Sequence, residues 1–396
     1  MKKVYLDNAA TTQVDSQVLA TMRPYFGKYF GNASEPHTWG QVARKAIEES
    51  RLKLAQFLGA KPKEIIFTSC ATESINLAHK GLIESFKVTK FQSDKVPHVI
   101  TTSIEHKAVL ETCKHLQQIG WAKVTYLPVD KYGLVKVADV EKAIRPETVL
   151  VSIMYVNNEV GTIEPISKIG EFLRTYNKQH RTKIYFHTDA TQAIQYLDCQ
   201  VDKLGVDLLS LTGHKFYAPK GIGALYIRRG VPLVRQQDGG SQESGLRAGT
   251  ENVPYIIALG KAVELISKSK FLISKKIEKL RDRLTEGVLR IPKIKLTGHP
   301  TKRAPHIASF VIDGVEGEAM LLLLSDRGIA ASSGSACTSG TLAPSHVLTA
   351  MGIPQELAHG SVRFSLGKDT TTQDIDYVLE VMPKIVAQLR RMAPKV

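Results

Sequence analysis

The chain has 396 residues, 43% of them hydrophobic and 23% charged, a composition typical of a folded protein with room for a large domain and a smaller one. No apolar run approaches the roughly 20 residues of a membrane-spanning helix, and the opening MKKVYLDNAATT lacks the apolar core of an export signal. The four cysteines form no CxxC pair, which argues against zinc and dithiol motifs and favours a reducing compartment. We therefore expect a cytoplasmic protein with no membrane span and no bound metal.

The formal net charge of +15 raises the question of an acidic partner or a nucleic acid. The densest basic stretch, residues 268–284, predicts a helix because its apolar residues recur at helical spacing. These apolar residues are Phe271, Ile273, Ile277, Leu280 and Leu284. The lysines between them fit either a solvated helix face or a docking surface for an acidic protein or RNA. Aromatic residues do not alternate with the basic ones as base stacking requires, so we expect no direct nucleic-acid binding.

Short apolar segments rich in β-branched and aromatic residues predict strands, with helical patterns such as 167–180 between several of them. The predicted strands are 64–69, 98–103, 148–156, 183–189, 207–212 and 223–228. This alternation predicts a parallel, doubly wound α/β sheet with helices on both faces. Ligands of such sheets bind at the carboxyl ends of the strands.

A change of pattern near residue 260 predicts a second, smaller α/β domain. It contains predicted strands at 306–313 and 361–367 and predicted helices at 316–328 and 372–392. We expect a large domain over 15–260, and a small domain that combines 1–14 with 261–396.

Polar residues follow the predicted strands where a packed core would not place them. Ala71 and Thr72 open a helix whose free N–H groups suit an anion, although Thr72 also fits the ordinary role of a helix N-cap. His106 and Asn158 follow the next strands, and a lone histidine there also fits an ordinary polar residue. Asp189 ends a further apolar strand, where a carboxylate needs a partner.

Lys215 follows the fifth predicted strand, in TGHKFYAPKG. Desolvation at such a position lowers the pKa of a lysine and makes its amine a nucleophile, whereas a lysine on a surface loop would keep its charge. A lysine for a Schiff base, Asp189 for a pyridinium nitrogen and a phosphate-binding helix start together indicate pyridoxal phosphate.

Ordered motifs along nearly the whole chain resemble those of the cysteine desulfurases of iron–sulfur assembly, the NifS/IscS type of the class V aminotransferase family. They are YLDNAATT, TSCATES, EHKAV, NNEVG, HTDATQA, TGHKFYAPKGIGALY, RAGTEN, SSGSACTS and SVRFSLG. The resemblance implies the fold type I architecture of pyridoxal-phosphate-dependent transferases, with a mostly parallel seven-stranded sheet and a smaller C-terminal α/β domain. Two positions depart from the family pattern: Cys70 stands where many relatives have glycine, and Thr212 replaces the usual serine.

The resemblance also implies a role for each site residue. Lys215 would form the imine with the cofactor, Asp189 would hold the ring nitrogen protonated, and His106 would stack on the ring and move protons. The other implied cofactor contacts are Ala71, Thr72, Asn158, Gln192, Thr212 and His214, with Thr250 supplied by the second subunit of a homodimer. Arg363, together with Asn158, would bind the substrate carboxylate through its bidentate fork.

Cys337 lies within SSGSACTSG, a run of small residues over 332–340. We expect a mobile loop at about 332–343, since flexible glycines and low bulk would let a thiol reach the cofactor and then an acceptor. Its thiolate would take sulfur from L-cysteine, leaving L-alanine and a persulfide. The persulfide would pass to a sulfur-acceptor protein, either an iron–sulfur scaffold or a tRNA-thiolation enzyme.

Other functions fit parts of this pattern. One is a selenocysteine lyase or another class V pyridoxal phosphate enzyme. Another is a basic RNA-binding or adaptor protein that keeps the fold without the chemistry. The end of the chain, RRMAPKV, is expected to lack the longer tail with which some relatives grip a scaffold protein.

Overall fold

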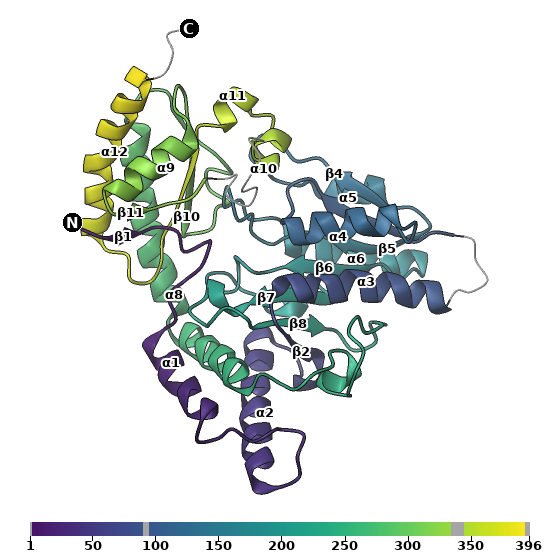
Figure 1. The fold of residues 1–396 in the computed structure, drawn as a ribbon. Helices are drawn as coiled ribbons and strands as arrows, with labels where there is room; N and C mark the ends of the chain where they lie inside the picture. The colour runs from purple at the N-terminus through teal and green to yellow at the C-terminus, as the bar shows by residue number, and fades with distance from the viewer. Residues whose placement is uncertain (1, 90–94, 334–343, 393–396) are drawn as a thin grey trace.

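The computed structural model describes residues 2–89, 95–333 and 344–392. Figure 1 shows a large sheet with helices along it, beside a second group in which α9, α12 and β10 lie together. The N-terminus lies next to α12 in this second group, so the first residues of the chain are close to the last helix.

The large sheet has seven strands in the order β2-β8-β7-β6-β5-β3-β4. Their bounds are β2 Ile65–Thr68, β3 His98–Thr102, β4 Lys123–Leu127, β5 Thr148–Ser152, β6 Tyr185–Asp189, β7 Leu208–Thr212 and β8 Gly223–Ile227. Neighbouring strands are parallel except at β8, which is antiparallel to both β2 and β7. The predicted mostly parallel α/β fold is therefore confirmed.

Two features of this sheet were not specified by the prediction. The short segment 213–222 joins β7 to β8 without a crossover helix, and such a connection pairs the two strands antiparallel. Strand β4 was not predicted, because it lies at the sheet edge and its residues are mostly half-buried or exposed. A half-exposed edge strand lacks the continuous apolar run that marks a buried parallel strand.

Helices cover both faces of the large sheet, as the alternation predicted. Their bounds are α1 Ser16–Met22, α2 Thr38–Leu58, α3 Ala71–Thr89, α4 Lys107–Gln118, α5 Val137–Ala143, α6 Ile166–His180 and α7 Val201–Leu204. On β3, Ile100 packs into one core with α2 and α6, whereas Val99 packs into another with α3 and α4. Successive residues of a strand point to opposite faces, so each buried strand supplies two cores.

A second sheet has the order β12-β10-β9, with all pairs antiparallel. Its strands are β9 Ile294–Leu296, β10 Ile307–Ile312 and β12 Ser361–Ser365, and its helices are α9 Gly317–Asp326, α10 His346–Ala350, α11 Gln355–Ala358 and α12 Thr372–Met392. Strand β1, Val4–Tyr5, pairs in parallel with β11, Ile329–Ala330. Val4 and Leu6 consequently join the core of the second sheet.

Helix α8, Val253–Leu289, connects the two cores. Buried residues from Val253 to Ile266 of this helix belong to the core of the large sheet, where the helix packs against α1 and α2, and those from Ile277 to Val288 belong to the second core. The expected boundary near residue 260 lies inside this helix, and the domain limits remain a prediction. In the described ranges, no helix combines the length and apolarity needed to cross a bilayer.

The basic segment 268–284 lies within α8, so the helix predicted there is confirmed. Ile277, Leu280 and Leu284 are buried, but 67% of Phe271 is exposed. Phe271 precedes the half-buried Ile273 by two residues, about 200° around a helix. It therefore lies on the solvent side, with the Lys275 Nζ 4.3 Å from its ring centroid.

Candidate active site

A pocket of about 390 Å³ lies at the carboxyl ends of the large-sheet strands, beside residues of the second sheet. The predicted site residues that line it are Ala71, Thr72, His106, Asn158, Asp189, Gln192, Thr212, His214, Lys215 and Arg363. Parallel strands present their carboxyl ends at one edge of a sheet, which explains why residues far apart in sequence converge here.

Lys215 enters the pocket from the turn that follows β7. Its Nζ donates hydrogen bonds to two backbone carbonyls, that of Ala9 at 2.8 Å and that of Ala10 at 2.7 Å. The amine is therefore held at a defined position, which argues against a lysine on an exposed loop.

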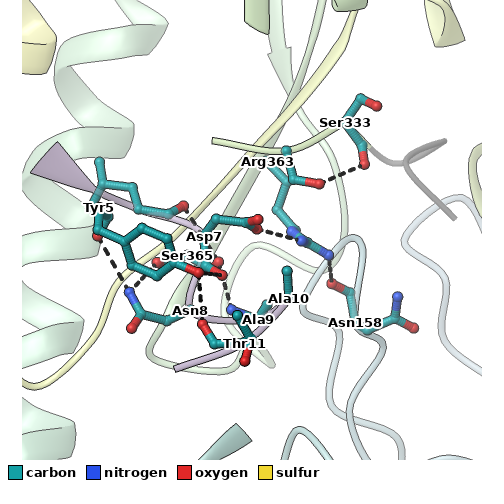
Figure 2. Close-up of polar contacts among 12 residues, drawn as sticks. Tyr5, Asp7, Asn8, Ala9, Ala10, Thr11, Asn158, Ser333, Arg363 and Ser365 are labelled. Atoms are coloured by element: carbon teal, nitrogen blue, oxygen red, sulfur yellow. Dashed lines mark hydrogen bonds and ion pairs between the residues drawn. The ribbon is translucent and has the colours of Figure 1, made fainter. Parts of the chain in front are cut away.

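The N-terminal segment 7–12 forms one wall of the pocket and was not predicted to take part. Figure 2 shows this segment against β12, where the Ala9 N–H donates to Ser365 Oγ at 2.8 Å and Asn8 Nδ2 donates to the Ser365 carbonyl at 2.9 Å. On its other side the Thr12 N–H donates to the His214 carbonyl at 2.8 Å. The segment thus ties the second sheet to the turn that carries Lys215.

Asp189 and His106 occupy neighbouring strand exits. Asp189 ends β6, is 6% exposed, and accepts a hydrogen bond from the Thr191 N–H at 2.9 Å. His106 is the N-cap of α4, where its Nδ1 accepts from the Ala108 N–H at 3.1 Å. Burial lowers the pKa of His106, and the positive charge of Lys215 acts in the same direction against the raising effect of Asp189. His106 is consequently neutral near pH 7, with its hydrogen on Nε2.

Glu105 is a buried carboxyl beside His106 that the sequence analysis missed. Its Oε1 accepts from Thr102 Oγ1 at 2.7 Å and from the Met154 N–H at 3.0 Å. Burial raises the pKa of Glu105 to about 8, and the charge of Asp189 adds to this. Glu105 is therefore protonated near pH 7.

Arg363, on β12, reaches the pocket from the second sheet. Figure 2 shows its guanidinium between Asp7, whose Oδ1 accepts from Nη2 at 2.9 Å, and the Asn158 carbonyl, which accepts from Nη1 at 2.8 Å. The Arg363 and Asp7 side chains are 7% and 21% exposed. The Arg363 Nε is buried and has no hydrogen-bond partner in the part of the chain that the structure describes. Asp7 and the main chain of Asn158 thus orient the guanidinium.

The predicted phosphate end of the pocket lies at the start of α3. This helix begins at Ala71, so Thr72 lies inside its first turn and the alternative reading of Thr72 as N-cap is wrong. Thr212 Oγ1 donates to the Ile222 carbonyl at 3.1 Å, and His214 Nδ1 lies 3.2 Å from Thr11 Oγ1. Burial and the charge of Lys215 lower the pKa of His214 to about 4, so its ring is neutral.

Gln192 also lines the pocket, where its Nε2 donates to the Ala9 carbonyl at 2.9 Å. Its Oε1 lies 3.2 Å from Nε2 of His306, a residue just before β10 that the sequence analysis did not single out. The signal available was a histidine next to an apolar strand, which is too common to identify a site.

Two predicted residues are not among those that line this pocket. Thr250 is exposed in the segment before α8. Cys337 and most of the predicted loop 332–343 lie outside the described residues, but Ser332 and Ser333 line the pocket just before them. Cys70, also on the lining, is a free thiol 3.7 Å from Ser69 Oγ.

Residues 4–378 match the family model described as aminotransferase class-V. The chain belongs to the class-V aminotransferase family. Pyridoxal phosphate dependence is a general property of this family.

Members named cysteine desulfurase are similar to this chain over its full length. "Cysteine desulfurase IscS" of Methanosarcina thermophila is 51% identical, with 99% of this chain and 94% of that protein covered. "Cysteine desulfurase 2" of Trichormus variabilis is 48% identical, covering 100% of this chain and 96% of that protein. The predicted placement among NifS/IscS-like cysteine desulfurases is therefore confirmed.

Two solved structures share the fold of this chain. A "NifS-like protein" superposes with a TM-score of 0.90 at 39% identity, covering 98% of this chain and 100% of that one. A structure of "SspA in complex with cysteine" gives a TM-score of 0.78 at 38% identity, covering 93% and 100%. Neither a selenocysteine lyase nor an RNA-binding adaptor is favoured by these comparisons.

Proposed function

We propose that this protein is a cysteine desulfurase that removes sulfur from L-cysteine, yielding L-alanine and a persulfide on Cys337. The observation that carries the proposal is the convergence of Lys215, Asp189, His106 and Arg363 on one pocket of about 390 Å³. An amine nucleophile, a carboxylate, a neutral imidazole and a guanidinium are the groups that this chemistry on an amino acid requires.

The pocket fits pyridoxal phosphate in size and in donor set. Its volume is within the range of small-molecule sites, and the first turn of α3 presents backbone N–H groups suited to a phosphate. Gly223 of β8 faces this turn, and a Cβ there would lie 2.7 Å from the Cys70 carbonyl carbon, so glycine permits the close approach. When bound, the cofactor supplies an electron sink for the substrate α-carbon.

Each side chain of the pocket has a separate role in binding the substrate or the cofactor. Arg363 would bind the substrate carboxylate, and Asp189 would face the ring nitrogen of the cofactor and favour its protonated form. Lys215 would hold the cofactor through Nζ, and Thr72, Thr212 and His214 would hold its phosphate. His106, neutral and with Nδ1 occupied by the Ala108 N–H, offers its Nε2 hydrogen to the reacting groups.

Cys337 carries the sulfur. Four positions separate it from Ser333 on the pocket lining, and a chain of this length spans up to about 14 Å. Its thiolate attacks the substrate Sγ, a new S–S bond forms, and the C–S bond breaks with its electron pair passing to the substrate β-carbon. Protonation of that carbon gives L-alanine, and the transferred sulfur stays on Cys337.

We further propose a homodimer in which Thr250 of one subunit contacts the cofactor phosphate of the other. Three large apolar side chains in the segment that leads into α2 and at its start are exposed: Phe26, Phe30 and Trp39, at 60%, 71% and 61%. Exposed apolar groups of this size favour burial against a second surface.

We propose that the sulfur acceptor is a protein, either an iron–sulfur scaffold or a tRNA-thiolation enzyme. A reducing cytoplasmic setting is supported by Cys113 and Cys199, which are free thiols.

The decisive experiment compares Cys337→Ala with the wild type loaded with pyridoxal phosphate. We expect the variant to keep the cofactor absorbance and to lose at least about 100-fold in alanine formation, because the thiolate proposed to accept the sulfur is removed. Cys199→Ala is the matched control: Cys199 is buried and its thiol pKa is raised to about 12, so it is inert. Equal turnover of Cys337→Ala and wild type, or no added sulfur at residue 337 by mass spectrometry, would refute the proposal.

A further inference from the structure

We propose that His306 is a positioning residue that donates from Nε2 to Oε1 of Gln192 and so aims the second N–H of the Gln192 amide at the cofactor. The inference rests on the proposed function, because it concerns the same pocket. Nothing in the sequence motifs assigns a role to His306.

The orientation of the Gln192 amide follows from its fixed neighbour. The Ala9 carbonyl is an acceptor only, and it lies 2.9 Å from the amide nitrogen of Gln192. Turning the amide over would place two acceptors against each other, so the nitrogen must face Ala9. Oε1 of Gln192 then faces His306 Nε2, 3.2 Å away.

This orientation in turn determines the tautomer of His306. An amide oxygen only accepts, so the hydrogen of the imidazole must be on Nε2. Nδ1 is buried and has no partner among the described residues, as expected for an atom that carries no hydrogen. Burial lowers the pKa of His306 to about 3, and the charges of Arg363 and Arg281 act in the same direction. The ring therefore stays neutral.

The ring of His306 is held in place by packing. It stacks on Tyr196, with ring centroids 4.3 Å apart and planes at 18°. His306 is 2% exposed and precedes β10 of the second sheet, whereas Gln192 follows β6 of the large sheet. The rigid ring of His306, beside the second sheet, thus fixes the orientation of the Gln192 side chain, beside the large sheet.

These contacts leave one N–H of the Gln192 side-chain amide available to a ligand. Its oxygen faces His306 and one of its N–H groups faces Ala9, so the second N–H is what it offers a ligand. The family resemblance implies that Gln192 contacts the phenolic oxygen of the cofactor, and there this donor would make the oxygen less basic and would lower the pKa of the imine formed by Lys215. Without His306 the amide can rotate, and the donor is lost.

The first test uses protein without cofactor, so it does not depend on the proposed function. In protein carrying ¹⁵N-labelled histidine, the His306 signal, assigned by its absence in His306→Phe, is expected to show protonated Nε2 and unprotonated Nδ1 from about pH 5 to 9. A signal with the hydrogen on Nδ1, or a charged ring in this range, would overturn the proposal.

The second test measures the imine pKa by titrating the visible absorbance of loaded protein. His306→Phe keeps a ring to stack on Tyr196 but removes the donor, and we expect it to raise the imine pKa by about one unit, as one lost hydrogen bond to a charged group implies. Gln192→Ala should give the same rise, and the double variant no more than Gln192→Ala alone. His306→Gln, which restores a donor near the Nε2 position, should return the pKa toward the wild-type value.

Other outcomes separate the inference from the proposed function. Additive shifts in the double variant, or no shift in His306→Phe, would overturn the positioning role even though the enzyme binds its cofactor. Absence of a visible band in wild-type protein would instead refute the proposed function, and the tautomer measurement would still decide the His306–Gln192 geometry.

Discussion

Replacing Glu243 by glutamine is expected to destabilise the protein through one buried ion pair. Glu243 and Arg51 form a bidentate pair, with Nη1–Oε2 at 2.8 Å and Nη2–Oε1 at 2.7 Å, and their side chains are 4% and 11% exposed. The Phe67 N–H of β2 also donates to Oε2 at 2.7 Å. Three donors therefore converge on two carboxylate oxygens.

A glutamine at position 243 cannot satisfy all three donors. In its better orientation the amide oxygen serves Arg51 Nη1 and the Phe67 N–H, while its amide nitrogen meets Nη2 and that bond is lost. One charge-assisted hydrogen bond contributes about 1.5–3 kcal/mol, and Arg51 loses its buried counter-charge. Glu48 remains 3.1 Å from Arg51 Nε but is 57% exposed, so it compensates only in part. We expect Glu243→Gln to lower the free energy of unfolding by about 2–4 kcal/mol.

The assay is urea unfolding followed by circular dichroism, with Asp376→Asn as the matched control. Asp376 also accepts two hydrogen bonds from one arginine, Arg283, but those side chains are 47% and 53% exposed. Removing that surface charge is expected to cost less than about 1 kcal/mol. Equal losses in the two variants would show that burial of the Arg51–Glu243 pair does not set its contribution, and the reasoning would fail.

Three further predictions concern the pocket. Glu105→Gln should remove one component of the pH dependence of stability: the raised pKa of about 8 means that the folded protein retains a proton that the unfolded chain releases, so the contribution of Glu105 is fully present below about pH 4.5 and falls by up to about 1.4 kcal/mol per pH unit as pH rises toward 8. Urea midpoints at about pH 5 and pH 9 measure this, and parallel pH trends in the two proteins would contradict it. Arg363→Lys should raise the KM for L-cysteine about 10- to 100-fold, because an ammonium cannot replace the fork held by Asp7 and Asn158; steady-state kinetics that change kcat alone would argue against carboxylate binding. Mixed dimers of Thr250→Ala and Lys215→Ala subunits should recover wild-type cofactor affinity in one of their two sites, measured by absorbance titration, whereas no recovery would place Thr250 in its own subunit's site.

The fold and the centre of the pocket were predictable because their signals are local. Short runs rich in β-branched, aromatic or leucine residues located β3, β6 and β7, and polar residues that a packed core would not place stand at or after the ends of these strands. Parallel strands converge at their carboxyl ends, so Asp189 and Lys215 had to meet once the sheet was inferred. The motifs then identified the family, and the comparisons confirm that assignment.

The partners that orient these groups were decided only by the tertiary structure. Asp7 meets Arg363, and His306 meets Gln192, across 356 and 114 positions of sequence. The Ala9 and Ala10 carbonyls hold Lys215 through main-chain atoms, which any residue would supply. The exposure of Phe271, the antiparallel pairing of β8 and the edge strand β4 were likewise not predicted. The sequence alone determined most of the segments that form strands and helices, because periodicity and propensity act over a few residues. Which carbonyl, ring or carboxylate stands opposite a given side chain depends on how distant segments pack, and no local pattern records that.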